Sequence, residues 1–103
     1  MVIFQVTIPA GGKVNITDRV HGSAIPANIP TATYVQQLVI QNNAGHTLRI
    51  GDSTVSSTKG IVISPGSPGG SLNEGGFMNY GSYLSDWWLF GTSADVIDIL
   101  YIA

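Results

Sequence analysis

The stretch from Leu38 to Gly66 constrains the fold more than any other part of the chain, because turn-rich segments divide it into short apolar runs. These runs are Leu38–Gln41, Thr47–Ile50 and Ile61–Ser64. In the middle run, Leu48 and Ile50 fall on one face, and the polar residues between them fall on the other. This alternation with a period of two residues is typical of a half-buried β-strand.

The segments between these runs carry turn chemistry. Asn42–His46 contains Asn-Asn-Ala-Gly, and both Asn and Gly tolerate the positive φ angles that tight hairpin turns need. Gly51–Gly60 is rich in Ser, Thr and Gly. The stretch is therefore predicted to fold as a meander of three strands, with a hairpin turn at Asn42–His46.

The same alternation recurs along the rest of the chain. It predicts further strands at Val2–Ile8, Lys13–Thr17, Tyr34–Gln41, Asp86–Phe90 and Asp95–Ile102. No stretch shows the 3.6-residue apolar stripe of a helix. We expect one all-β domain over residues 1–103, a β-sandwich or jelly-roll-like barrel of about seven or eight short antiparallel strands.

Two more features refine this prediction. The unbroken apolar run at Leu38–Ile40 indicates a central strand that is covered on both faces. The segments Gly22–Thr33 and Ser64–Ser85 are rich in Pro or Gly and are predicted to be loops. Ten residues are predicted to form the core: Phe4, Val6, Leu38, Ile40, Leu48, Ile50, Ile61, Ile63, Ile97 and Ile99.

Composition excludes several functional classes. Only 10% of the residues are charged, and the four cations Lys13, Arg19, Arg49 and Lys59 are scattered along the chain. We therefore expect no nucleic-acid partner, because such binding needs a basic patch. No apolar run is long enough for a membrane span, and there is no cysteine for a disulfide. The chain is expected to be complete from Met1, with a first strand rather than a signal peptide at its start, and to be made in the cytoplasm of a host.

The sequence offers few candidates for catalysis. His21 and His46, the only histidines, lie beside turn residues and are predicted to be surface residues. Gly51–Ser53 follows a strand, so Asp52 is expected to cap its own turn. Asp86, Asp95 and Asp98 are expected to be turn or surface residues. The alternative to a chain without metal is a calcium site in a loop that uses Asp52 or Glu74. We expect no catalysis, no cofactor and no metal.

Trp87-Trp88 is the most unusual pair in the chain. Adjacent residues of a strand face opposite ways, so one tryptophan should be in the core and the other should point outward. Either the strand is buried on both faces, or the outward ring lies at an interface or stacks on a sugar.

The pattern QN-x-x-G-x-T-L-x-I-GD-S-x-V-S-x-x-x-GI-x-I-x-PG-S, over Gln41–Ser67, resembles small structural proteins of tailed bacteriophages. The closing segment Leu84–Ala103 is similar to the last two strands of the same proteins. The family includes capsid decoration (cement) proteins and fibre-associated modules. The resemblance implies a β-sandwich without catalysis, often trimeric and located in the virion.

We therefore expect a virion structural protein that binds the outside of a phage head. Its partners would be further copies of itself, with a trimer favoured, and the major capsid protein or another virion protein. The alternative is a carbohydrate- or receptor-binding module of a phage fibre or tail. The subunit boundary is expected on Asp86–Phe90 and Asp95–Ile102, with the loop Ser67–Tyr83 reaching the neighbour. Six residues are predicted to form this interface: Phe77, Met78, Tyr80, Tyr83, Trp87 and Trp88.

Overall fold

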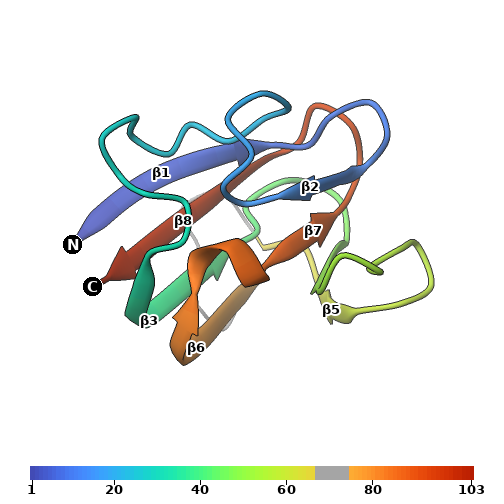
Figure 1. Ribbon diagram of the computed structural model, residues 1–103. Helices are drawn as coiled ribbons and strands as arrows, with labels where there is room; N and C mark the ends of the chain where they lie inside the picture. Colours follow the sequence, from blue (N-terminus) through green and yellow to red (C-terminus); the bar gives the residue numbers. More distant parts are fainter. Residues whose placement is uncertain (67–74) are drawn as a thin grey trace.

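The computed structural model describes residues 1–66 and 75–103, and these residues fold into a β-sandwich of two four-stranded antiparallel sheets (Figure 1). The strands are β1 (Val2–Thr7), β2 (Lys13–Asn15), β3 (Tyr34–Gln41), β4 (Leu48–Gly51), β5 (Ile61–Ile63), β6 (Gly76–Tyr83), β7 (Trp88–Phe90) and β8 (Val96–Ile102). A single 3-10 turn, η1 (Leu84–Asp86), precedes β7. The predicted all-β sandwich is confirmed.

The two sheets differ in the length of their strands. One has the order β1-β8-β3-β6, with strands of six to eight residues, and is called the long-strand sheet below. The other has the order β2-β7-β4-β5, with strands of three or four residues, and is called the short-strand sheet. In Figure 1 the long-strand sheet lies to the left and the short-strand sheet to the right.

The core lies between the sheets, where alternate residues of the strands point inward. Nine of the ten predicted core residues are buried, and Leu38, Ile40 and Ile99 are fully so. The exception is Ile61, which is 62% exposed, so this prediction was wrong. Ile61 starts the three-residue edge strand β5 beside an open hollow, and the opposite sheet does not cover it.

The predicted hairpin at Asn42–His46 is also wrong, because β3 and β4 belong to different sheets. Asn42 is fully buried and directs the crossing. Its side-chain Nδ2 donates to the carbonyl oxygens of His46, at 2.9 Å, and Ile63, at 3.3 Å, and its Oδ1 accepts from the N–H of Ala44. The turn residues therefore carry the chain from one sheet to the other, and only β4 and β5 pair as the predicted meander requires.

Part of the predicted loop Ser64–Ser85 is a strand. The segment Gly76–Tyr83 forms β6, which pairs with β3 from Gln41↔Gly76 to Tyr34↔Tyr83. The glycines of this segment masked the alternation of Phe77 and Asn79 with Met78 and Tyr80. The portion of the predicted loop at 67–74 lies outside the described residues.

Two further strand predictions need correction. Strand β7 begins at Trp88 rather than Asp86, because Leu84–Asp86 forms the 3-10 turn, which buries Leu84. Strand β3 is central, with β8 and β6 as neighbours, but only one of its faces is buried. Val39 lies on the other face and is half-exposed, because no described element packs over it. Over residues 1–66 and 75–103, no helix has the length and apolarity needed to cross a membrane.

Candidate interaction surface

The outer face of the long-strand sheet carries apolar side chains in register. Ile3 pairs with Leu100, Leu100 with Val39, and Val39 with Met78, so one apolar row crosses all four strands. The next row contains Ile102, Gln37 and Tyr80. We define the outer apolar face as Ile3, Val39, Met78, Tyr80, Leu100 and Ile102. Contiguous apolar patches of this kind mark contact sites in soluble proteins.

This face is open to solvent. Ile3 is 62% exposed and Tyr80 70%, and both Met78 and Ile102 are 38% exposed. Several strands are apolar at successive positions, as in Leu100-Tyr101-Ile102, so each has an apolar side chain on both faces. The inward residue of each such pair fills the core, which leaves the outward residue without a cover within the described part of the chain.

One carboxylate lies at the border of the outer apolar face. Asp98 is the only charged residue in the four strands of this sheet. Its two carboxylate oxygens accept from Gln5 Nε2, at 2.9 Å, and from Asn43 Nδ2, at 3.2 Å. Beside it lies a shallow hollow of about 200 Å³ lined by Ile3, Val39, Gln41, Asp98, Ile99 and Leu100. The face thus combines apolar side chains with one carboxylate that already has partners.

Met78 lies at the centre of the polar contacts on this face. Gln37 Nε2 donates to its sulfur at 3.0 Å, and the Tyr80 hydroxyl donates to the same sulfur at 3.1 Å. A thioether is a weak acceptor. Both donors therefore stay available to a stronger acceptor of a partner molecule.

The six predicted interface residues do not lie on one surface. Met78 and Tyr80 lie on the outer apolar face. Phe77 points inward against Trp87, with ring centres 5.4 Å apart, and the Trp87 Nε1 donates to Ser82 Oγ. Tyr83 packs edge-to-face on Tyr34 at the end of β6, with ring centres 5.3 Å apart, and Trp88 is on the opposite sheet.

The predicted boundary on Asp86–Phe90 and Asp95–Ile102 would therefore span both sheets rather than one surface. Strand β7 belongs to the short-strand sheet and β8 to the long-strand sheet, so their outer faces point away from each other. Sequence reasoning missed Ile3, Val39, Leu100 and Ile102 as partners of Met78 and Tyr80. The apolar residues on both faces of the last strand were the signal that pointed to them.

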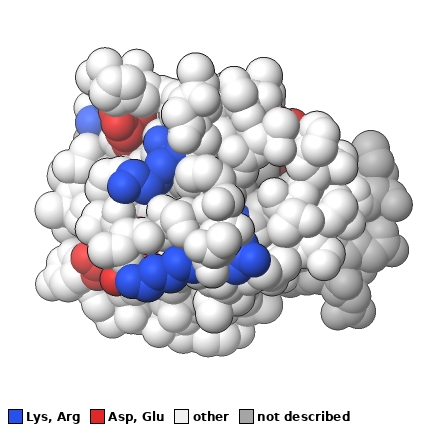
Figure 2. All heavy atoms as spheres, turned by 90° about the vertical axis from the view of Figure 1, so that its right-hand side faces the viewer, with Lys and Arg blue, Asp and Glu red and all other residues white. Residues whose placement is uncertain are grey.

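The outer face of the short-strand sheet has a different character. Phe90 of β7 pairs with Lys13 of β2 on one side and with Arg49 of β4 on the other. Lys59 is in the loop between β4 and β5. Figure 2 shows lysine and arginine atoms in separate groups on this side of the molecule, with acidic atoms beside them. The Lys13 Nζ lies 5.5 Å from the centre of the Trp88 ring and donates to the carbonyl oxygen of Ser53 at 2.8 Å, so the lysine covers that ring.

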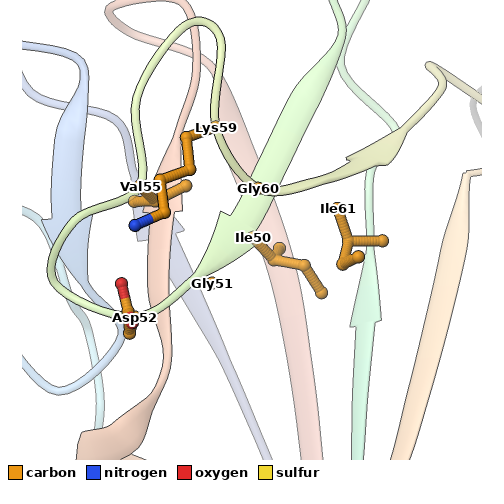
Figure 3. Close-up of a pocket in the computed structure, with 7 residues that line it drawn as sticks. All are labelled: Ile50, Gly51, Asp52, Val55, Lys59, Gly60 and Ile61. Carbon is orange, nitrogen blue, oxygen red and sulfur yellow. The ribbon is translucent and has the colours of Figure 1, made fainter.

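The loop between β4 and β5 encloses a hollow of about 310 Å³ (Figure 3). Asp52, Val55 and Lys59 lie on one side of it, and Ile50 and Ile61 lie on the other. The Lys59 Nζ donates to Thr54 Oγ1 at 2.6 Å, and the Thr54 hydroxyl donates to Asp52 Oδ1 at 2.5 Å. The hydrogen bonds from the Thr54 hydroxyl and backbone N–H lower the pKa of Asp52. Asp52 caps its own turn, as predicted, and the polar groups at the rim satisfy one another.

Both histidines are exposed and pair with carboxylates. His21 Nδ1 lies 2.7 Å from Asp18 Oδ2, and His46 Nδ1 lies 2.9 Å from Asp95 Oδ2. Neither pair gains a third ligand, and among residues 1–66 and 75–103 no group of three or more His, Cys, Asp or Glu is placed to hold a metal ion.

Comparison of the chain with protein-family models, with curated proteins and with solved structures finds no match. The candidate site therefore rests on the geometry of the chain itself, and the outer apolar face is the surface that this geometry singles out.

Proposed function

We propose that this protein is a non-enzymatic structural protein of a virion. In this proposal it is a capsid decoration, or cement, protein that binds the outside of a phage head as a homo-oligomer. The observation that carries the proposal is the outer apolar face, which spans all four strands of the long-strand sheet. Asp98, which lies beside this face, is the only charged residue in those strands. The resemblance of Gln41–Ser67 to phage structural proteins supports the same role.

The physical basis is burial of apolar surface. Removing apolar area from water contributes about 25 cal/mol per Å². Ile3 and Tyr80 are mostly exposed in the isolated chain, so a partner that covers them gains this free energy without any chemistry. A sheet also loses little backbone conformational entropy on binding, because its paired strands are already ordered. A protein that strengthens a shell needs these properties and no active site.

A carbohydrate- or receptor-binding role is the second candidate, and the arrangement of the aromatic rings gives it less support. Tyr80 lies on one sheet and Trp88 on the other, while Trp87 packs against the core. These rings form no common platform for a sugar. Lys13 also covers the ring of Trp88, which points outward from the short-strand sheet together with Phe90.

The test uses particles produced from the genome that encodes this chain. Mass spectrometry of purified particles should detect the protein in a fixed ratio to the major capsid protein. Particles made without the protein should release their DNA at a lower temperature, and addition of purified protein should restore the original temperature. Particles that lack the protein, or whose heat resistance does not depend on it, would contradict the proposal.

A further inference from the structure

Strand β6 forms an unusually open edge of the long-strand sheet. Within the described residues it pairs with β3 and with no second strand. It is eight residues long, and its sequence GFMNYGSY contains no charged residue and no proline. Natural proteins usually protect an edge strand with charges, prolines, a bulge or a covering segment, because its free N–H and C=O groups can pair with another strand.

The other edges are protected or short. Along β1, the N–H of Thr7 donates to the carbonyl oxygen of Gly22 at 2.9 Å, and the N–H of Ala24 donates to that of Gln5 at 2.8 Å. This contact covers the outer edge of β1 from Gln5 to Thr7. The edge strands β2 and β5 have three residues each. Among the described strands, β6 therefore has the longest edge without a covering segment.

A polar group on β6 is also without a partner. The side-chain Oδ1 of Asn79 is buried and accepts no hydrogen bond from the described residues. A buried acceptor without a partner destabilises the fold, because the water that it loses is not replaced. Asn79 lies at the middle of β6, on the face directed toward the interior of the sandwich.

We propose that β6 pairs antiparallel with β6 of a second copy of this chain, with Asn79 opposite Asn79 of that copy. Identical strands pair in this way about a twofold axis, so the contact is the same on both sides. In this register each Asn79 amide Nδ2 donates to the Oδ1 of the other copy, which satisfies the unpaired acceptor. Met78 lies opposite Tyr80 of the second copy, and Phe77 lies opposite Gly81.

A second copy fits this edge better than a charged segment would. The strand has no charge to attract an ionic partner, and two copies meet without repulsion of like charges. Pairing also joins the two outer apolar faces into one sheet of eight strands, because Met78 and Tyr80 belong both to β6 and to that face. The inference deepens the proposed function, since it names the partner within the homo-oligomer, and it predicts a dimer in place of the trimer that the family resemblance implies.

Single-cysteine variants test the register directly, because the natural chain has no cysteine. Residues opposite each other in an antiparallel pair have Cα atoms about 4.5 or 5.5 Å apart, which is within the range of a disulfide. Asn79→Cys should therefore form a disulfide-linked dimer under mild oxidation at least about tenfold faster than Ser82→Cys. Ser82 is the control, because it lies on the same strand but opposite Gly76 of the second copy.

A second measurement does not depend on a cysteine. Sedimentation of the wild-type protein at about 100 μM should show a dimer. Met78→Lys should weaken that dimer at least about tenfold, because it brings two ammonium groups together near the axis. Ile61→Lys, at the exposed edge strand β5, should leave the dimer unchanged.

A monomer at this concentration would overturn the inference, as would an oligomer in which Asn79→Cys is linked no faster than Ser82→Cys. The two proposals fail separately. A monomer that is still a component of the particle removes only the β6 pairing, and a β6-paired dimer that is absent from particles removes only the virion role.

Discussion

Asn42 shows at the scale of single residues how a polar side chain sets the topology of an apolar sandwich. Its buried amide donates to the carbonyl oxygens of His46 and Ile63. Asn42→Ala should lower the free energy of unfolding by about 2–4 kcal/mol, because it leaves both acceptors without their donor. Urea denaturation measures this loss. The control Asn43→Ala removes a half-buried side chain next to it and should cost much less; equal losses would contradict the assigned role.

Asp18 gives the stability of the protein a dependence on pH. Burial alone would raise the pKa of its carboxyl, but hydrogen bonds from His21 and from the N–H groups of His21 and Val20 outweigh burial and lower the pKa. Ionised Asp18 therefore stabilises the fold above about pH 4, and this contribution is lost as the pH falls through the lowered pKa. The wild type should exceed Asp18→Asn in unfolding free energy at pH 6, and the difference should shrink at pH 3. A constant difference between these pH values would count against the assignment.

The inward residues could be predicted from the sequence because alternation has a direct physical cause. A strand exposes successive side chains on opposite faces, so Leu48 and Ile50 had to share a face. The role of Asn42 could not be predicted in this way. An Asn in a turn indicates a change of direction, but it does not indicate whether the next strand joins the same sheet or the opposite one.

Single elements of this fold depend on close backbone contacts, and the cover of β1 is the clearest example. A Cβ added to Gly22 would lie 2.1 Å from the carbonyl oxygen of Thr7, which is far shorter than a van der Waals contact. Gly22→Ala should therefore detach the covering segment, lower the unfolding free energy by about 1–3 kcal/mol and expose an edge that promotes aggregation. Gly45→Ala is the matched control, because a Cβ there meets nothing within 4 Å. Thermal unfolding and light scattering measure both effects, and similar behaviour of the two variants would refute the role of the cover.

Strand β6 marks the limit of prediction at the scale of elements. Its glycines are typical of a loop and disfavour a strand. Pairing with β3 from Gly76 to Tyr83 outweighs this preference. The 3-10 turn at Leu84–Asp86 was missed for a similar reason, since the burial of Leu84 between the sheets is a tertiary contact. Both elements exist because of neighbours that are distant in sequence, and local patterns do not contain that information.

The whole molecule has two unlike faces. One is the outer apolar face of the long-strand sheet, and the other carries Lys13, Arg49 and Trp88 on the short-strand sheet. The class of fold could be predicted from the sequence, whereas this division could not. It depends on which strands share a sheet, and β7 and β8, although neighbours in sequence, are placed in different sheets.

The central claim is that the outer apolar face attaches the protein to its shell, and two matched substitutions test it most directly. Ile3→Glu places a carboxylate on this face, and Val62→Glu places the same group at an exposed position of the opposite sheet. Each variant would be added to particles that lack the protein, and the bound fraction would be measured by co-sedimentation. The account predicts that Ile3→Glu loses attachment at least about tenfold, because burying an unpaired charge is costly, while Val62→Glu binds like the wild type. Undiminished binding by Ile3→Glu, or loss of binding only by Val62→Glu, would contradict it.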